Sequence, residues 1–249
     1  MQLDLFASKR VLIGCERSGI VRDAFLARGF DAWSCDIEAD ERRSNRHIRN
    51  DVREVLGWGW DLLIIAHPPC TRLCNSGVRW LTAPPTKLSL EHHTPSEICA
   101  YVSMTTEERL AFMWRKLEEG AALFSDLWNV QNIPHVAIEN PIMHGYGRER
   151  IANYAPPQIV QPWWFGEPQF KGTGLYLRNL PKLVASNPLV PPKPGTAKHR
   201  RWSRVHRQSG WGRHGETRAQ ARSRFFPGIA AAMAEQWGDV LVADARLAA

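Results

Sequence analysis

Short, mostly apolar segments of strand length recur along the first half of the chain. Residues 10–14, 32–36, 62–66 and 136–138 form such runs, and the last two are unbroken. Runs that are apolar throughout are typical of strands in a parallel sheet with both faces covered. Residues 18–28 carry apolar side chains at helical spacing, which predicts a strand, helix, strand unit at the start of the chain.

Two further helices are predicted in the middle and at the end of the chain. Thr105-Thr-Glu-Glu108 has the form of a capping box and opens a predicted helix over 105–128. The preceding stretch 81–103 contains three prolines, so we expect irregular backbone there. The Ala-rich residues 229–241 predict a helix that packs on the sheet. Together these patterns predict an α/β fold.

Chemically useful side chains follow two of the predicted strands. The third strand leads into Pro68-Pro69-Cys70, where two prolines fix the path of the backbone just before the thiol. Glu139 follows the fourth strand. A cysteine near the end of an apolar strand is commonly a buried, inert thiol, and a carboxyl group there often caps the backbone. The two prolines favour the alternative, in which Cys70 is a nucleophile and Glu139 lies beside it.

A glycine-bearing turn joins the first predicted strand to its helix. Gly14-Cys-Glu-Arg-Ser-Gly19 lets the backbone approach a ligand closely, although its spacing differs from the dinucleotide fingerprint. Asp36 ends the second predicted strand, a position from which a carboxylate binds ribose hydroxyls in nucleotide-binding folds. Asp51 lies at another expected strand end. These residues predict an adenosine-containing cofactor; the alternative is that they serve only as turns and caps.

Basic residues are concentrated in one late segment. The net charge is +7, and residues 193–224 carry ten Lys and Arg against one Glu, which leaves a net charge of −2 elsewhere. Arginines alternate there with Trp202 and Trp211, and both side-chain types stack on nucleic-acid bases. The segment therefore predicts contact with a nucleic acid, and a solvated basic loop is the alternative.

The cysteine count and the hydropathy of the chain indicate its cellular location. The five cysteines are an odd number, and no basic region followed by an apolar stretch opens the chain, so free thiols and a cytoplasmic location are expected. No apolar run approaches the length that spans a bilayer, so we expect no membrane partner. The sequence contains no signal of the oligomeric state.

Two short motifs, taken in order behind the glycine turn, resemble a known family. Pro68-Pro69-Cys70 and Glu139-Asn140-Pro141 are similar to the Pro-Pro-Cys and Glu-Asn-Val motifs of the cytosine-C5 DNA methyltransferases. The chain is most similar to the short phage and prophage members of this family. The resemblance implies a Rossmann-like S-adenosylmethionine-dependent methyltransferase fold, with a mostly parallel sheet flanked by helices and a reduced basic appendage. It also implies DNA as partner and the cytoplasm of a bacterial host.

The resemblance further implies roles for individual residues. In catalysis Cys70 would add to C6 of cytosine, Glu139 would donate a proton to N3, and Lys171 would help to hold the base or a phosphate. The cofactor S-adenosyl-L-methionine would contact Gly14, Cys15, Glu16, Ser18, Gly19, Asp36, Ile37, Asp51, Val52 and Pro68. The substrate would contact Pro69, Asn140, Arg72, Arg79, Gln169, Arg200, Arg201 and Arg204.

The expected organisation has three parts. A catalytic domain covers 1–183 and includes a lid at 71–103, a short basic segment over 184–224 contacts nucleic acid, and a C-terminal helix within 225–249 packs back on the catalytic domain. The family has a sizeable target-recognition region where this chain has the basic segment. Because phosphate contacts carry no sequence information, we expect short or relaxed specificity for a base that is flipped out of its stack.

Alternatives stay open at this point. The same chemistry could act on RNA or on a free cytosine nucleotide, and the unusual glycine turn leaves open a modified S-adenosylmethionine that delivers a group other than methyl. A non-catalytic nucleic-acid-binding protein on this fold is a further alternative. The last alternative is a zinc enzyme. The spacing of Cys70 and Cys74 is one residue too long for the motif of the zinc deaminases, so we expect no metal.

Overall fold

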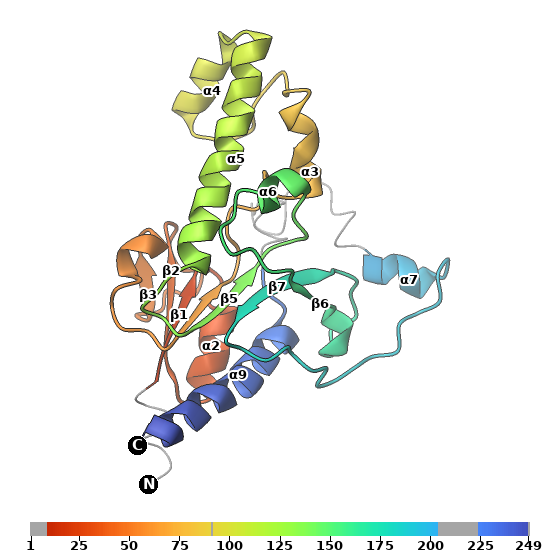
Figure 1. Cartoon of the computed structure of the whole chain (residues 1–249). Coiled ribbons are helices and arrows are strands. Elements are labelled where there is room, and N and C mark those ends of the chain that lie inside the picture. The colour runs from red at the N-terminus through yellow and green to blue at the C-terminus, as the bar shows by residue number, and fades with distance from the viewer. Residues whose placement is uncertain (1–8, 91, 204–223, 249) are drawn as a thin grey trace.

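The structure is a computed structural model, and it describes residues 9–90, 92–203 and 224–248 (Figure 1). Within these residues the chain forms a seven-stranded sheet covered by helices on both faces. The strands are β1 (Arg10–Gly14), β2 (Asp31–Asp36), β3 (His47–Arg49), β4 (Leu62–Ile65), β5 (His135–Glu139), β6 (Gln158–Val160) and β7 (Thr173–Arg178).

The order of the strands identifies the fold class. The described strands lie in the order β3-β2-β1-β4-β5-β7-β6, and β7 runs antiparallel to both of its neighbours. The pairs among β1 to β5 are all parallel. Without β7, the order is the 3-2-1-4-5-6 of a doubly wound Rossmann sheet. The predicted Rossmann-like fold, with a mostly parallel sheet flanked by helices, is therefore confirmed.

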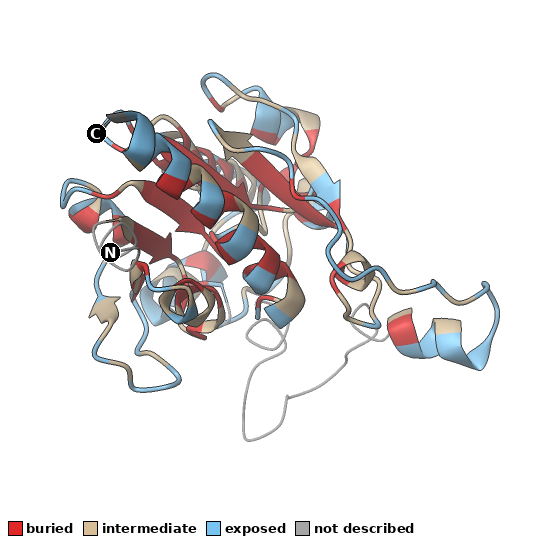
Figure 2. Cartoon of the chain, turned by 90° about the horizontal axis from the view of Figure 1, so that it is seen from below, coloured by how far each residue is buried: buried red, intermediate tan, exposed pale blue. Residues whose placement is uncertain are grey.

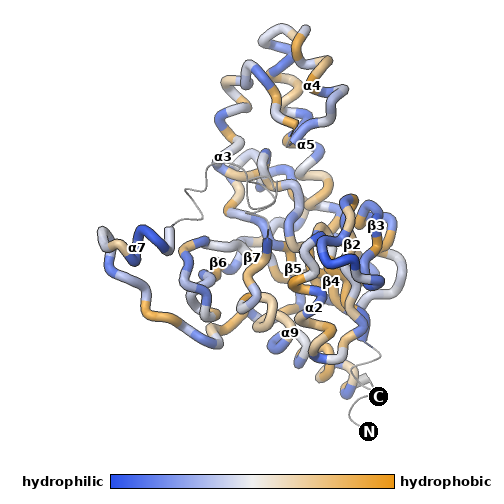
Figure 3. Tube along the Cα trace, turned by 180° about the vertical axis from the view of Figure 1, so that it is seen from behind, coloured by the Kyte–Doolittle hydropathy of each residue, from blue (hydrophilic) through white to orange (hydrophobic). Residues whose placement is uncertain are grey.

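Helices cover the two faces of the sheet and explain the unbroken apolar strands. On one face lie α2 (Ile20–Ala27) and α9 (Pro227–Ala248), and on the other lies the lower part of α5 (Thr106–Trp128). Along β4, Leu62 and Ile64 pack towards α2 and α9, whereas the alternate residues pack towards α5. Figure 2 shows the buried strands beneath α9, and Figure 3 shows apolar residues concentrated in the sheet. A strand that is covered on both faces has no polar side.

The predicted helices are confirmed, with one correction. Helix α5 carries the capping box expected at Thr105, and α9 is longer than predicted at both ends. The stretch 81–103, expected to be irregular, contains the helix α4 (Pro95–Val102), so that expectation is wrong for these residues. Pro95 occupies the first turn of α4, where a missing N–H costs no hydrogen bond.

Several short elements were not predicted. They include β6 and β7, the helices α3 (Asn75–Val78), α6 (Gly145–Arg148) and α7 (Ala197–Trp202), and the 3₁₀ turns η1 (Val52–Val55), η2 (Arg79–Leu81) and η3 (Pro162–Trp164). For β3, only the strand end before Asp51 was expected. The upper part of α5, with α4 beside it, projects beyond the sheet, and α7 lies at the periphery (Figure 1). Across the residues that the structure describes, no helix is long and apolar enough to cross a membrane.

Candidate active site

The carboxyl ends of the central strands meet where the strand order reverses. β1 pairs with β2 on one side and with β4 on the other. The connection that follows β1 leads to β2, whereas the connection that follows β4 leads in the opposite direction to β5. Gly14 at the end of β1 is level with Cys35 on β2 and Ile65 on β4. The Ala66 amide donates to the Gly14 carbonyl oxygen at 2.9 Å, which extends the pairing by one residue. In open α/β sheets, ligands bind in the crevice at this switch point.

Cys70 lies in a tight turn that follows β4. The amides of Leu73 and Cys74 both donate to the Cys70 carbonyl oxygen, at 2.9 and 3.2 Å. Gly77 closes the turn, because a Cβ atom at this position would overlap the carbonyl oxygen of Thr71. Pro68, at the start of the turn, is buried, and Cys70 is half-buried. The thiol is thus held in place by backbone hydrogen bonds and still reaches the surface.

Glu139 ends β5, the strand next to β4, and lies close to the turn that holds Cys70. The register of the two parallel strands places Ile65 level with Ile138, so the residues that follow both strands emerge side by side. Glu139 is 7% exposed, and its Oε2 lies 3.5 Å from Nδ1 of His67. The Cys74 thiol lowers the pKa of Cys70 by hydrogen bonding to its sulfur, while burial and the negative charge of Glu139 oppose this effect; the net shift is downward. The structure therefore brings the thiol and the carboxyl group together.

Contacts between the two turns fix their relative position. Cys74 and Met143 form an antiparallel bridge, and the His144 amide donates to the Leu73 carbonyl oxygen at 3.0 Å. The His144 ring nitrogen Nε2 lies 2.8 Å from the Arg72 carbonyl oxygen. The segment after Glu139 thus binds the backbone of the Cys70 turn at three successive residues, which keeps the two reactive groups in register.

A narrow pocket opens beside Glu139 and His67. It is shallow and half open, and the empty space of about 180 Å³ beside its lining includes open solvent. Its lining combines polar groups with aromatic and aliphatic side chains: His67, Glu139, Lys171, Thr173, Arg224, Phe225, Phe226 and Ile229. Burial lowers the pKa of His67, so its imidazole is neutral at pH 7, and its ring lies 5.5 Å from that of Phe225. A flat, partly apolar ring with polar edges suits such a lining.

Sequence reasoning missed several of these residues. The sequence patterns assign no role in the site to His67, although it stands three residues before Cys70 and beside Glu139 in space. Cys74 was considered only for its spacing, and Phe225, Phe226 and Ile229 only as parts of the C-terminal region. The last three come from a segment far along the chain, so no local pattern could connect them to the pocket.

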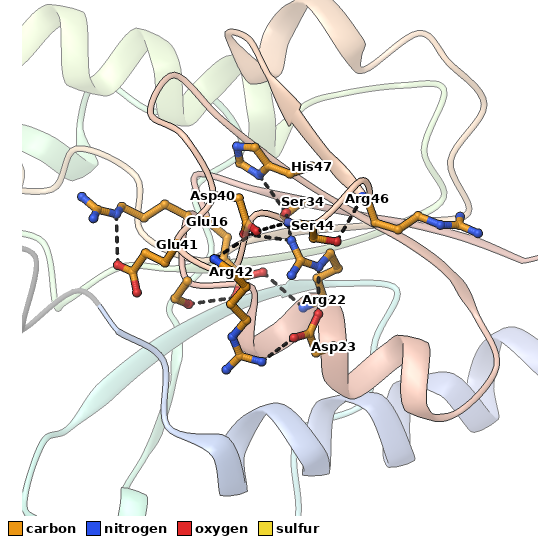
Figure 4. A network of polar contacts seen from close by, with 12 residues as sticks. Glu16, Arg22, Asp23, Ser34, Asp40, Glu41, Arg42, Ser44, Arg46 and His47 are labelled. Carbon is orange, nitrogen blue, oxygen red and sulfur yellow. Dashed lines mark hydrogen bonds and ion pairs between the residues drawn. The ribbon is translucent and has the colours of Figure 1, made fainter.

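The glycine turn after β1 is organised around the side chain of Glu16 (Figure 4). Glu16 is 1% exposed, and its carboxyl group accepts hydrogen bonds from the amides of Val21 and Arg22 at 2.7 and 3.1 Å. The Ser18 hydroxyl donates to the same group at 3.3 Å. These amides open α2, the site at which nucleotide-binding folds hold a phosphate. Glu16 therefore fills the anion site with the chain's own carboxyl group.

Arg22 ties this turn to the loop that follows β2. Its guanidinium group is 1% exposed and donates to Ser34 Oγ at 2.8 Å and to Asp40 Oδ1 at 3.0 Å (Figure 4). A Cβ atom at Gly19, which has φ +67°, would press against this guanidinium group. The buried ion pair thus joins the start of α2 to the loop after β2, the strand that ends at Asp36.

The remaining predicted cofactor residues lie at the carboxyl edge of β1, β2 and β3. Asp36 accepts from the Glu38 amide at 2.9 Å, and burial raises its pKa. Ile37, next to it, is 72% exposed and offers an apolar surface beside the carboxyl group. Asp51 caps η1, and its hydrogen bonds to Arg53 lower its pKa; Val52 beneath it is buried. Cys15 has φ +54°, and burial raises the pKa of its thiol far above the ordinary value.

The predicted substrate residues are more dispersed. Pro69 is exposed beside Cys70, and Asn140 is fully buried behind it. Arg72 donates towards His93 at 3.0 Å, and Arg79 is exposed with its guanidinium 4.2 Å from the Trp80 ring. Gln169 is half-buried, and its backbone amide donates to Glu167.

The predicted basic contacts divide between described and undescribed residues. Arg200 and Arg201 are exposed on α7 at the periphery of the fold, and α7 is held through the buried Trp202, whose ring lies 5.2 Å from that of Phe170 (Figure 1). Arg204 and Trp211 lie outside the residues that the structure describes. Between 9 and 248, again only among described residues, no group of three or more His, Cys, Asp or Glu side chains is placed to hold a metal ion.

Comparisons with known proteins give a remote structural likeness. No protein-family model matches the chain. No curated protein matches it. Among solved structures, the chain is similar to the crystal structure of a mutant of DNMT2 from Spodoptera frugiperda, with 11% sequence identity and a TM-score of 0.38. The likeness covers 75% of this chain and 56% of that chain, so the chain spans little more than half of its length.

Proposed function

We propose that the protein transfers a methyl group from S-adenosylmethionine to C5 of cytosine in a nucleic acid, with DNA as the expected polymer. One observation carries the proposal. Cys70, with a lowered thiol pKa, and the carboxyl group of Glu139 lie at the ends of the adjacent parallel strands β4 and β5 and influence each other electrostatically, next to the switch point between β1 and β4. A nucleophile beside a proton donor is the pair that activation of an electron-poor ring requires.

Cys70 supplies the covalent step. Cytosine is a poor nucleophile at C5, but a thiolate that adds to C6 converts C5 into an enamine-like carbon. The S–C6 bond forms with the electron pair of the Cys70 sulfur. After C5 has been alkylated, the C5 proton leaves to solvent and the S–C6 bond breaks, so that its electron pair returns to Cys70. The lowered pKa of Cys70 increases the thiolate fraction that begins this cycle.

Glu139 stabilises the charge that develops on the base. In its protonated form the carboxyl group donates to N3 as the thiolate adds, and it recovers this proton when the S–C6 bond breaks. The neutral ring of His67, 3.5 Å away, orients the carboxyl group without placing a second positive charge beside it. Lys171 lines the same pocket, and its positive charge contributes to the lowered pKa of Cys70. Uracil and thymine carry a hydrogen on N3, so this donor favours cytosine.

The residues around the glycine turn suit S-adenosylmethionine. The carboxyl group of Glu16 accepts the hydrogen bonds of the amides at the start of α2, so these amides are not available to a cofactor phosphate. This favours a cofactor without a phosphate group. Asp36 and the exposed Ile37 offer a carboxylate for ribose hydroxyls and an apolar surface for adenine. When bound, S-adenosylmethionine supplies an electrophilic methyl group on its sulfonium sulfur. A derivative that carries a larger group would meet the same residues.

The experiment that tests this function compares substrates in one assay. The protein is incubated with labelled S-adenosylmethionine and double-stranded DNA, single-stranded DNA, RNA or dCMP, and the products are digested for nucleoside mass spectrometry. We expect 5-methylcytosine from DNA with the unmodified chain and none with Cys70→Ala. If only RNA or only dCMP yields product, the proposed reaction at C5 is supported, and the proposed DNA substrate is wrong. Unmodified cytosine with every substrate, or full activity of Cys70→Ala, would contradict the proposal.

A further inference from the structure

Arg72 places a positive charge beside the Cys70 turn, and no carboxylate neutralises it. The residue stands two positions after Cys70 and is half-buried. Its guanidinium group donates a hydrogen bond to Nε2 of His93 at 3.0 Å, and within the described parts of the chain it forms no ion pair with an Asp or Glu side chain. Burial of this charge lowers the pKa of Arg72. A charge that is removed from water without an opposite partner is costly, so its retention here points to an anionic ligand.

The hydrogen bonds of His93 fix the protonation of its ring. Nδ1 lies 3.1 Å from the Ser89 carbonyl oxygen, which can only accept, so Nδ1 carries a hydrogen. Nε2 faces the Arg72 guanidinium group, which can only donate, so Nε2 presents its lone pair. The ring is therefore neutral, and burial lowers its pKa in the same direction. Glu97, whose charge reaches His93, is itself paired with Lys116.

Arg72 is held at both its backbone and its side chain. The Arg72 carbonyl oxygen lies 2.8 Å from Nε2 of His144, and its guanidinium group is held by His93. His93 is 9% exposed, and its ring lies 6.0 Å from that of Phe112 on α5. A guanidinium group has five N–H donors in a planar fork, of which His93 accepts one. A fork of this kind, fixed in advance, matches the oxygens of a phosphate group.

We infer that Arg72 and His93 form a binding site for the phosphate group of the substrate, in which Arg72 donates to the phosphate oxygens and His93 is a positioning residue. The inference deepens the function proposed above and rests on it for the identity of the substrate. Since Arg72 stands two positions from Cys70, the phosphate belongs to the cytosine nucleotide or to its neighbour along the strand.

A neutral imidazole suits this role better than a carboxylate. A carboxylate would form a charge-assisted bidentate pair with Arg72 and would compete with the phosphate for the same donors. The lone pair of His93 fixes the direction of the guanidinium group and leaves its full positive charge to the ligand. The phosphate can come from a phosphodiester of a nucleic acid or from a free cytosine nucleotide, and the experiment separates these two sources.

The test measures binding in the Cys70→Ala chain without a cofactor, so that neither a covalent bond nor methyl transfer contributes. One arm follows the fluorescence anisotropy of a labelled single-stranded oligonucleotide with one cytosine over a salt series. The other arm compares dCMP with deoxycytidine, which lacks the phosphate, by titration calorimetry. Arg72→Gln removes the charge, His93→Phe removes the acceptor and keeps a ring, and His93→Gln restores an acceptor. Arg28→Gln, which removes the same charge from an ion pair on α2, is the control. Thermal unfolding shows whether each variant is folded, and Arg72→Met replaces the glutamine variant if that one is not.

We expect Arg72→Gln to reduce the slope of log affinity against log salt by about 1, and Arg28→Gln to leave it unchanged. His93→Phe should weaken oligonucleotide binding by about threefold to tenfold, and His93→Gln should recover most of this loss. If the phosphate comes from a free nucleotide, the slope stays constant, but Arg72→Gln weakens the binding of dCMP about tenfold more than that of deoxycytidine.

Two results would overturn the inference. If both the slope and the preference for dCMP over deoxycytidine are unchanged in the folded Arg72 variant, there is no phosphate site at Arg72. If the two His93 variants bind equally well, His93 has no positioning role. If the binding changes occur as expected but no substrate is methylated by the chain with Cys70 intact, the proposed function fails and the phosphate site stands.

Discussion

The imidazole Nδ1 of His67 lies 3.5 Å from Oε2 of Glu139, and this contact joins the segments that follow two adjacent parallel strands. Within the described residues, the other ring nitrogen of His67 is buried without a hydrogen-bond partner. Burial lowers the pKa of the ring, so the imidazole is uncharged at pH 7. The contact with this neutral ring orients Glu139, which lines the pocket together with His67.

Replacement of His67 by phenylalanine tests this contact. Phenylalanine keeps the ring packed against Phe225 and removes both nitrogens, so the fold is expected to persist. The methylation rate kcat is expected to fall about tenfold to a hundredfold, because the Glu139 carboxyl group loses the group that orients it. His92→Phe, at an exposed position on the segment before α4, is the matched control. Equal kcat values and equal pH profiles for both variants would show that His67 has no such role.

The nucleophile turn depends on the absence of a side chain at Gly77. Alanine there would drive a methyl group into the Thr71 carbonyl oxygen, and we expect Gly77→Ala to lower the free energy of unfolding by about 1 to 3 kcal/mol. Gly57 has no atom within 4 Å of a built Cβ, so Gly57→Ala should change the stability by less than about 0.5 kcal/mol. Urea unfolding of both variants makes the comparison, and a difference near zero between them would rule out the tight turn.

The central strands could be predicted because their burial leaves a direct trace in the sequence. β4 is apolar at every position since both of its faces are covered, and the strands next to it show the same signature. β3 and β6 have three residues each, too few to show a period, and β7 contains a glycine. Helix α4 was missed because its proline, which stands in the first turn, has the same sequence signature as a break.

The site could be predicted only where residues follow neighbouring strands. Cys70 and Glu139 come directly after apolar runs, and parallel strands bring such ends together. The direction of the Glu16 side chain was not predictable, because an acidic residue in a glycine turn can face the ligand or the helix with equal sequence support. It faces the helix and is buried. The pocket wall from Phe225 to Ile229 depends on the packing of α9, which no local pattern specifies.

The buried carboxyl group of Glu16 should make stability depend on pH. Burial raises its pKa from 4.5 to about 7, so the native chain binds more protons than the unfolded chain between these values. Stability therefore falls as the pH rises through this window. Between pH 5 and 8, the unfolding free energy of the unmodified chain is expected to fall by about 2 to 3 kcal/mol more than that of Glu16→Gln. Urea unfolding at both pH values measures this difference, and parallel curves for the two chains would contradict it.

The arginines of α7 should contribute to nucleic-acid binding through phosphates. Arg200 and Arg201 are exposed on α7, and the Arg200 guanidinium group donates to the Gly195 carbonyl oxygen at 2.7 Å. We expect the double alanine variant to bind DNA more weakly and to reduce the slope of log affinity against log salt by about 2, roughly 1 for each lost phosphate contact. Arg28→Ala, which removes an arginine paired with Asp239, is the control and should leave the slope unchanged.

Fluorescence anisotropy over a salt series provides the measurement for these arginine variants. The same loss on every DNA sequence is expected, because phosphate contacts carry no sequence information. If the slope of log affinity against log salt is the same in the double variant and in the control, the two arginines of α7 do not contact the phosphates.

The central claim is that Cys70 bonds covalently to C6 of cytosine while Glu139 serves N3. An oligonucleotide with 5-fluorocytosine tests it directly, because the C5 substituent cannot leave as a proton and the adduct is held after alkylation. With S-adenosylmethionine present, intact-protein mass spectrometry should show one oligonucleotide bound per chain, and peptide mapping should place it on Cys70. The adduct should be absent in Cys70→Ser and strongly reduced in Glu139→Gln. No adduct with DNA or RNA, or an adduct that persists in Cys70→Ser, would contradict the account.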